Sequence, residues 1–332
     1  MERLVTDMTE TEILFDLLEK GISPAHAVSA CEKRLTDAGF EVVDYGTAWN
    51  LKAGGKYVVN HHETTLFAFT LPQNWSDREP AIRIAAAHTD FPCLRIKPSC
   101  DIQTNGYAQV NVEVYGGAIL NTWLDRPLGV AGRVAVRSED VFTPEVVTFQ
   151  SEKNLMTIPN LAIHMNREVN KGVELNKQTE LLPICGLSDD ADYFLDFLVK
   201  ELAVKKEDIL DFELTIYNKE KPEFVGLNDE FISASRLDNL NSCSALVSAI
   251  IESDRADGMN LIALFDHEEI GSRSKQGAGS ILLHDMLVRI LTECGLEKEV
   301  WNRLYNSIIL SVDVAHGLHP NYAGKMDLTN KP

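Results

Sequence analysis

Three runs of apolar residues constrain the fold of this chain more than any other feature. They are AIRIAAA (81–87), LIALF (261–265) and IILSV (308–312). None of them alternates between apolar and polar side chains, which is typical of strands buried on both faces of a mainly parallel sheet. Because helix-like segments accompany these runs along the chain, the sequence predicts an α/β fold with helices on both faces of the sheet.

Side chains that can bind a metal follow each run. In chain order they are His88 and Asp90, then Asp266, His267, Glu268 and Glu269, then Asp313. Open α/β sheets bind ligands beyond the carboxyl ends of their strands, so the three segments are expected to meet at one place. Their oxygen and nitrogen donors, without a thiolate cluster, suit zinc, manganese or cobalt.

Sequence spacing indicates roles for two pairs of these residues. His88 and Asp90 point to the same side of an extended chain, so Asp90 can hydrogen-bond the far nitrogen of His88 and fix its tautomer. Glu268 and Glu269 can divide two tasks, one carboxylate binding the metal and the other accepting a proton from the attacking water. The two pairs together predict a hydrolytic metal centre.

Each of these residues also has a simpler interpretation. Acids that follow a strand often cap the next helix and complement its dipole. A lone histidine such as His88 is more often satisfied in the core, and Asp313 alone would more often occupy a turn. His316 and His319 have the spacing of a helical ligand pair, but the following Pro320 favours a turn. The prediction therefore depends on the convergence of the three segments.

Composition disfavours several functional classes. The chain has 332 residues, with 31 Lys and Arg against 50 Asp and Glu, and its net charge of -19 makes nucleic acids and anionic membranes unfavourable partners. No apolar stretch approaches the length of a membrane span, and the start lacks the basic and apolar regions of a secretory signal. The six cysteines include no C-x-x-C pair, which indicates reduced thiols in a cytoplasmic protein.

The order of helical and β-type patterns indicates two domains. Short β-type segments separated by Gly, Asn and Pro fill the middle of the chain. Helical patterns lie at 8–19, 23–39, 188–202, 239–252 and 280–295. We therefore predict an α/β domain of residues 1–93 and 231–332, interrupted by a β-rich unit of residues 94–230.

Six sequence blocks resemble those of the aspartyl aminopeptidase family of dinuclear zinc exopeptidases. In chain order they are AAAHTDFPCLRIKP, NTWLDRPLGVAGRV, IPNLAIHMNREVN, SRLDNLNSCSALV, FDHEEIGSRSKQGAGS and SVDVAHGLHPNY. The resemblance covers most of the chain after the first two predicted helices. It implies an α/β peptidase domain interrupted by a β-rich dimerisation domain, and homo-oligomers that assemble from dimers into dodecamers.

The resemblance also implies a set of zinc ligands. The ligands of the first ion fall on His88 and Asp313, and a ligand of the second ion falls on Glu269. Asp238 falls on the carboxylate that bridges both ions. Two zinc ions per active site are therefore expected, with manganese or cobalt as alternatives.

Three further residues receive a role from the resemblance. Glu268 falls on the general base, and Asp90 falls on the carboxylate that supports His88. His164 matches a substrate-site histidine of the inserted domain, which in several family members reaches the active site of a neighbouring subunit.

Two departures from the family pattern affect these assignments. Asn121 stands in the stretch GGAILNTWLDRP, where many relatives have a histidine. No histidine follows His319, although a histidine near the C-terminus ligates the second ion in the family. We expect the chain to be a fragment rather than a defective subunit. In either case the second ion retains only Asp238 and Glu269.

These observations predict a metal-dependent aminopeptidase that removes the N-terminal residue of peptides. The name of the family suggests that this residue is Asp or Glu. A preference for acidic residues would require a nearby Lys or Arg, because the overall charge repels such peptides. A related dinuclear deacetylase or carboxypeptidase would share the metal chemistry but not the blocks NTWLDRP and IPNLAIHMNR. A non-catalytic or defective assembly subunit with an incomplete metal site is the remaining alternative.

Overall fold

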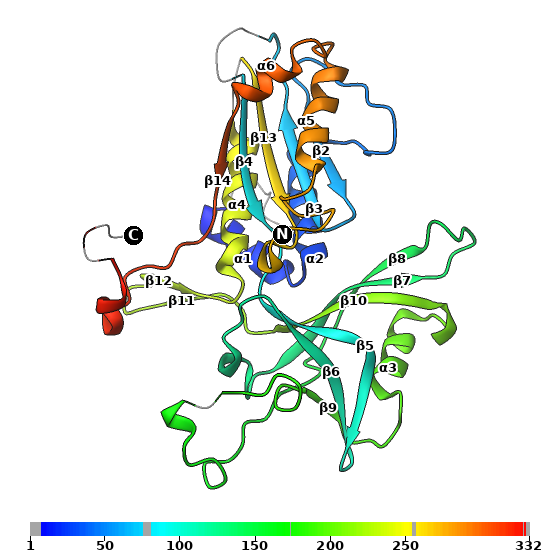
Figure 1. The fold of residues 1–332 in the computed structure, drawn as a ribbon, viewed down its shortest axis with the longest axis vertical. Helices are drawn as coiled ribbons and strands as arrows, with labels where there is room; N and C mark the ends of the chain where they lie inside the picture. Colours follow the sequence, from blue (N-terminus) through cyan, green and yellow to red (C-terminus); the bar gives the residue numbers. More distant parts are fainter. Residues whose placement is uncertain (1–7, 76–80, 173, 254–256, 328, 330–332) are drawn as a thin grey trace.

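Two six-stranded sheets organise the fold, drawn one above the other in Figure 1. The computed structural model describes residues 8–75, 81–172, 174–253, 257–327 and 329. The chain leaves the upper sheet after β4 (Ile82–His88) and enters the lower sheet at β5 (Cys93–Thr104). The metal-type residues that follow β4 therefore lie where the two sheets join.

The upper sheet has the strand order β1-β2-β3-β13-β4-β14. Its remaining strands are β1 (Glu41–Val42), β2 (Lys56–His61), β3 (Thr65–Thr70), β13 (Met259–Phe265) and β14 (Ile308–Ser311). β4 is parallel to both of its neighbours, β13 and β14, whereas β3 is antiparallel to β2 and β13. The three apolar runs thus form adjacent parallel strands, and the predicted α/β fold is confirmed.

Helices cover both faces of the upper sheet. One face carries α1 (Glu10–Lys20), α2 (Pro24–Asp37) and α4 (Leu237–Glu252), and the other carries α5 (Leu282–Glu293) and α6 (Val300–Tyr305). Successive side chains of a strand point to opposite faces, so Leu66 of β3 joins the first core and Phe67 joins the second. Both side chains are fully buried, and each such burial stabilises the fold by about 1.5–3 kcal/mol.

The boundaries of the first two helices follow their capping signals. Thr9 caps α1 in a reciprocal capping box with Glu12, and Gly21 follows the last helical residue. Ser23 caps α2, and Pro24 occupies its first position, where a missing N–H has no cost. The predicted ranges, 8–19 and 23–39, agree with these two helices to within two residues at each end.

The lower sheet is antiparallel and has the order β8-β7-β10-β5-β6-β9. Its other strands are β6 (Tyr107–Tyr115), β7 (Leu128–Val136), β8 (Glu145–Gln150), β9 (Ile184–Gly186) and β10 (Ile209–Asn218). The helix α3 (Tyr193–Leu202) packs on this sheet through Phe194 and Leu198, in a core separate from those of the upper sheet.

Several short elements lie outside the two sheets. The hairpin of β11 (Glu223–Val225) and β12 (Phe231–Ser233) lies between β10 and α4. The 3-10 helices are η2 (Leu120–Trp123), η3 (Val169–Lys171), η4 (Lys206–Asp208), η5 (Glu268–Ile270) and η6 (Pro320–Lys325). The start of α4 and the helix η5 both lie close to the end of β4, which brings distant segments to one place.

The prediction that all three apolar runs are buried on both faces is wrong for β14. Ile308, Ile309 and Leu310 are 55%, 57% and 61% exposed. The reason is the position of β14 at the end of the sheet, where it pairs with β4 alone among the described strands. An apolar run specifies a strand, but its burial depends on what packs against it.

Two other properties bear on the expectations from composition. All six cysteines are unpaired, and four of them are buried. Every helix that the structure describes is too short or too polar to cross a membrane.

Candidate metal centre

The carboxyl ends of β4, β13 and β14 meet at one edge of the upper sheet. His88 is the last residue of β4 and pairs with Phe265, so the turn that carries Glu268 starts beside it. The N–H of Val312 donates to the carbonyl of Ala86 at 2.8 Å, which places the next residue, Asp313, at the same edge. The parallel register therefore aligns the ends of all three predicted segments.

Three of the predicted metal ligands form a compact group. The ligand atoms of His88, Asp238 and Asp313 all lie within 4.8 Å of one another, and no other such group occurs among the described residues. Nε2 of His88 lies 3.3 Å from Oδ1 of Asp238 and 3.5 Å from Oδ1 of Asp313. An imidazole and two carboxylates are a typical zinc ligand set.

Asp238 reaches this group from the start of α4. Its backbone is not helical, with φ -79° and ψ 111°, and the peptide bond to Asn239 is cis. The side chain of Asn239 donates to the carbonyl of Val312 at 3.0 Å. This hydrogen bond ties the segment of Asp238 to the segment of Asp313.

Asp90 orients His88 from the opposite side. Nδ1 of His88 lies 3.0 Å from the carbonyl oxygen of Asp90 and 3.3 Å from its carboxylate. Because Nδ1 is engaged in this way, Nε2 is left to face Asp238 and Asp313. The carboxylate of Asp90 is fully buried and also accepts hydrogen bonds from the backbone N–H groups of Glu268 and Glu269, each at 3.1 Å.

These contacts shift the pKa values of both residues of the pair. Burial lowers the pKa of His88, but the hydrogen bonds and negative charge of Asp90 outweigh it and raise the pKa to about 9. Burial raises the pKa of Asp90, but the hydrogen bonds of His88 and Tyr115 outweigh it and lower the pKa below its usual value. The negative charge of Asp90 therefore stabilises positive charge on His88 or on a cation that His88 binds.

The acidic members of the group fit a bound cation. Partial burial raises the pKa of Asp238, and the nearby carboxylate of Asp313 raises it further, while His88 opposes both effects. A divalent ion would relieve this repulsion between carboxylates. The side chains of Asp238 and Asp313 remain 53% and 55% exposed, which leaves the centre accessible to a substrate.

The structure places the two adjacent glutamates differently. Oε2 of Glu268 lies 3.8 Å from Nε2 of His88, and its side chain is 50% exposed. Glu269 lies outside the group of three, and its carboxylate accepts a hydrogen bond from the N–H of Gly117 at 3.4 Å. Partial burial raises the pKa of Glu269, and Asp90 and Asp238 add to the increase, which indicates a position near other acids.

Asp266 and His267 shape the turn rather than join the group. Asp266 is fully buried and accepts a hydrogen bond from the backbone N–H of His267 at 2.8 Å. Nδ1 of His267 lies 2.6 Å from the hydroxyl of Ser274. Asp266 and His267 thus have partners within the turn, whereas Glu268 faces Nε2 of His88 and Glu269 accepts from Gly117.

The remaining predicted histidines lie apart from the group. His164 is exposed in the long connection between β8 and β9. His319 accepts a hydrogen bond from the backbone N–H of Asn321 at 3.2 Å, at the start of η6. The turn interpretation of His316 and His319 therefore agrees with the structure.

Tyr115 is a residue of the site that the sequence does not reveal. Its hydroxyl donates to Oδ2 of Asp90 at 2.6 Å, and the pair is buried. Tyr115 ends β6 in an alternating β-type run, and this pattern is typical of an ordinary sheet residue. The pairing of β6 with β5, in which Tyr115 lies opposite Cys93, brings it close to Asp90.

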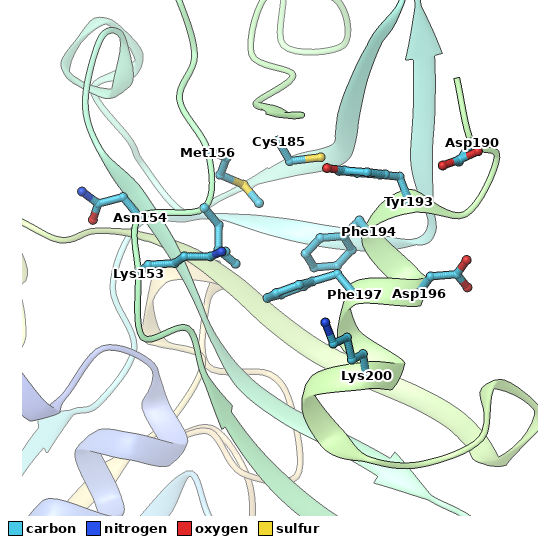
Figure 2. Close-up of a pocket in the computed structure, with 11 residues that line it drawn as sticks. Lys153, Asn154, Met156, Cys185, Asp190, Tyr193, Phe194, Asp196, Phe197 and Lys200 are labelled. Atoms are coloured by element: carbon cyan, nitrogen blue, oxygen red, sulfur yellow. The ribbon is translucent and has the colours of Figure 1, made fainter. Parts of the chain in front are cut away.

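Two cavities lie near the sheets. One, of about 490 Å³, opens beside Asp238 and is lined by Arg126, Lys221 and Arg236, among others. The other, of about 560 Å³, lies between α3 and residues 153–156. Figure 2 shows Phe194, Phe197 and Met156 grouped around it. The second cavity contains none of the predicted site residues.

Comparisons with known proteins identify similar sequences. The family described as "Aminopeptidase I zinc metalloprotease (M18)" matches residues 17–332. A protein of Clostridium novyi named "Probable M18 family aminopeptidase 2" is 41% identical over 325 residues, which are 96% of this chain and 75% of that protein.

Solved structures show the same similarity. A chain in the cryo-EM structure of the Ape4 and Nbr1 complex superposes with a TM-score of 0.88 at 32% identity, over 100% of this chain and 69% of that one. The structure of Chaetomium thermophilum mApe1 has a TM-score of 0.86 at 29% identity, over 97% of this chain and 78% of that one.

Proposed function

The chain belongs to the M18 family of zinc aminopeptidases, and we propose that it cleaves N-terminal residues from peptides at the group formed by His88, Asp238 and Asp313. This assignment of the site rests on one observation. One imidazole and two carboxylates have their ligand atoms within 4.8 Å of one another, and Glu268 lies beside them. Family membership and this group do not favour a non-catalytic assembly subunit.

His88 and Asp313 would hold one zinc ion, and Asp238 would be shared with a second ion on the side of Glu269. Bound zinc would polarise the scissile carbonyl and lower the pKa of the attacking water. The number of ions and the choice of zinc over manganese or cobalt are part of the proposal. Support comes from the donor types and from the repulsion between Asp238 and Asp313.

Glu268 is assigned as the general base. Its carboxylate accepts a proton from the attacking water and transfers it to the amine that leaves. Its partial exposure and its position 3.8 Å from Nε2 of His88 support this role, because it can reach both the solvent and the reacting groups. Asp90 acts through His88, by holding the imidazole in one orientation.

Specificity for the peptide terminus would follow from charge. The excess of carboxylates around His88 provides partners for the ammonium group at the start of a peptide. The cavity beside Asp238 is the proposed site for the first side chain. Within the described residues, Arg236 has no carboxylate within 4.0 Å and donates instead to Ser235 and to the carbonyls of Leu18 and Asn218. Arg236 is thus a cation that could favour Asp or Glu.

The assembly is also part of the proposal. We assign residues 94–230 as a dimerisation unit in a cytoplasmic homo-oligomer, with a dodecamer built from dimers as the complete form. His164 would then approach the active site of a neighbouring subunit, which agrees with its exposure and its distance in sequence from the group. Sedimentation velocity tests this assembly, and a purely monomeric protein would contradict it.

One experiment tests the proposed activity. Aminoacyl-nitroanilides that carry Asp, Glu, Leu or Lys are incubated with the protein, after removal of metal and after addition of zinc. We expect zinc-dependent release of nitroaniline, fastest for Asp and Glu. An N-acetylated Asp substrate is the control, because it lacks the free amine and should not react. Cleavage that persists without metal would exclude the proposed centre.

A further inference from the structure

The lower sheet touches the metal centre through the last residue of β6 and the two glycines that follow. Tyr115 is 6% exposed and Asp90 is 0% exposed, and their side chains form a hydrogen bond of 2.6 Å. Asp90 lies in the short connection between β4 of the upper sheet and β5 of the lower sheet, and Tyr115 pairs with Cys93, the first residue of β5. The contact therefore lies at the segment that joins the two sheets. Figure 1 shows this segment between β4 and β5.

The hydrogen bond from Tyr115 acts on a residue with many partners. Asp90 also contacts His88 and accepts from the N–H groups of Glu268 and Glu269. One oxygen, Oδ2, takes both the Tyr115 hydroxyl and the N–H of Glu269. Asp90 therefore links the Tyr115 hydroxyl to the imidazole of His88 and to the turn that carries both glutamates.

The next two residues contact Glu269 directly. The N–H of Gly117 donates to Oε2 of Glu269 at 3.4 Å. A Cβ atom at Gly116 would lie 2.7 Å from Oε2 and 3.0 Å from Cβ of Glu269, so the Glu269 side chain would have to move to admit it. Gly116 also has a φ of +72°, which favours glycine. The absence of a side chain at Gly116 lets the backbone after β6 lie against Glu269 in its present position.

Charged residues of the lower sheet hold Tyr115 in place. The guanidinium of Arg95 lies 3.9 Å from the centre of the Tyr115 ring. Arg95 also forms an ion pair of 2.9 Å with Glu213, which in turn pairs with Arg133 at 2.8 Å. These three residues come from β5, β10 and β7, so charged groups of the lower sheet hold one side of the ring. Tyr115 also belongs to the apolar core that covers one face of the upper sheet, so it is packed between the two sheets.

We propose that the segment Tyr115–Gly117 is a positioning element of the metal centre, which the lower sheet supplies within the same chain. Tyr115 sets the orientation of Asp90, and Gly116 and Gly117 set the position of Glu269. The lower sheet thereby has a role in the site that is separate from subunit contacts. The roles of Asp90 and Glu269 in this inference rest on the proposed function.

Tyr115→Phe tests the first contact, with Tyr57→Phe as the matched control. Tyr57 is 1% exposed, and its hydroxyl accepts a hydrogen bond from the N–H of Lys52, far from the centre. Zinc affinity is measured by competition with a chromogenic chelator. Removing a residue that hydrogen-bonds directly to a metal ligand costs roughly 10-fold to 100-fold in affinity. Because Tyr115 acts on His88 through Asp90, we expect Tyr115→Phe to weaken zinc binding by about 10-fold, at the lower end of this range, and Tyr57→Phe to leave it unchanged. Equal zinc affinities in the two variants would overturn the proposal.

Gly116→Ala tests the second contact independently, should Tyr115→Phe fail to fold. Its control is Gly106→Ala, because Gly106 has a similar φ of +83° and no atom within 4 Å of an added Cβ. Both variants introduce the same backbone strain, but only Gly116→Ala meets Glu269. We expect lower zinc stoichiometry or affinity in Gly116→Ala alone. Identical zinc binding in both variants would show that the approach to Glu269 has no function.

Zinc affinity separates this inference from the proposed function. If no peptide substrate is cleaved but Tyr115→Phe still weakens zinc binding, the proposed function fails and the positioning element stands. If peptides are cleaved and the variants match their controls in affinity and in kcat, the positioning element fails alone. Where both hold, kcat should fall more than KM rises in Tyr115→Phe, because the centre and not the substrate cavity is disturbed.

Discussion

Nε2 of His88 lies 3.3 Å from Oδ1 of Asp238, although the whole lower sheet separates the two residues in the sequence. The contact depends on the parallel pairing of β4 with β13 and β14 and on the packing of α4 against β4. The insertion of a second sheet between them does not disturb this geometry. It adds Tyr115 and the two following glycines to the surroundings of the centre.

Asp313→Asn should separate metal binding from stability. The side chain of Asp313 is 55% exposed, so the substitution should change the free energy of unfolding of the metal-free protein by less than about 0.5 kcal/mol. The substitution replaces a charged ligand by a neutral amide. We therefore expect zinc affinity to fall by more than roughly 100-fold, which exceeds the loss caused by removing a residue that only hydrogen-bonds to a ligand. Asp285→Asn in α5 is the control. A zinc affinity equal to that of the control would remove Asp313 from the ligand set.

Glu268→Gln should abolish turnover and retain the metal. The amide keeps the size of the side chain but cannot accept a proton, so kcat should fall roughly 100-fold to 10,000-fold while zinc binding and KM stay near their original values. Glu297→Gln, at an exposed position after α5, is the control. Activity close to that of the control would mean that another group removes the proton.

The sequence predicts the strand-end residues of the centre better than the others. His88, Glu268 and Asp313 follow apolar runs, and the convergence of parallel strand ends is a general property of α/β sheets. Asp238 follows no apolar run, because it starts α4, and only the family resemblance identified it. Tyr115 had no signal in the sequence, since its contact depends on the pairing of β6 with β5, which sets Tyr115 opposite Cys93.

The same distinction applies to the fold. Helix boundaries such as Ser23 and Gly21 follow local chemistry, so the sequence predicts them closely. The exposure of Ile309 depends on the order of strands in the sheet, which is a property of the whole fold and not of the run itself. Local signals therefore predicted the elements, and long-range packing decided what they bury.

Stability of the metal-free protein should depend on pH through His88. The folded pKa of about 9 lies above the usual 6.5, so the protonated imidazole stabilises the fold below pH 6.5. This contribution, up to about 3 kcal/mol for a buried group, is lost as the pH rises through 9. Urea unfolding at pH 6.5 and 9.5 measures the loss, and His88→Gln, which does not titrate, gives the baseline to subtract.

Zinc should remove this dependence on pH. A metal ion binds the neutral imidazole, so the zinc-loaded protein no longer gains stability from the proton on His88. We expect the difference between the original protein and His88→Gln to shrink with rising pH in the metal-free form and not in the zinc form. A metal-free difference that is constant from pH 6.5 to 9.5 would contradict the assigned pairing of His88 with Asp90.

The exposed face of β14 should promote association of this 332-residue chain. Ile308, Ile309 and Leu310 are each more than half exposed, and the strand has one described neighbour, so both apolar side chains and backbone groups can pair with another molecule. We expect Ile309→Lys to reduce concentration-dependent light scattering, because a charged side chain on an edge strand opposes pairing. Leu227→Lys is the control, since Leu227 is 101% exposed in the loop between β11 and β12 and lies on no sheet edge. An equal reduction in both variants would attribute the effect to added positive charge, whereas a reduction in Ile309→Lys alone would assign it to the edge of the upper sheet.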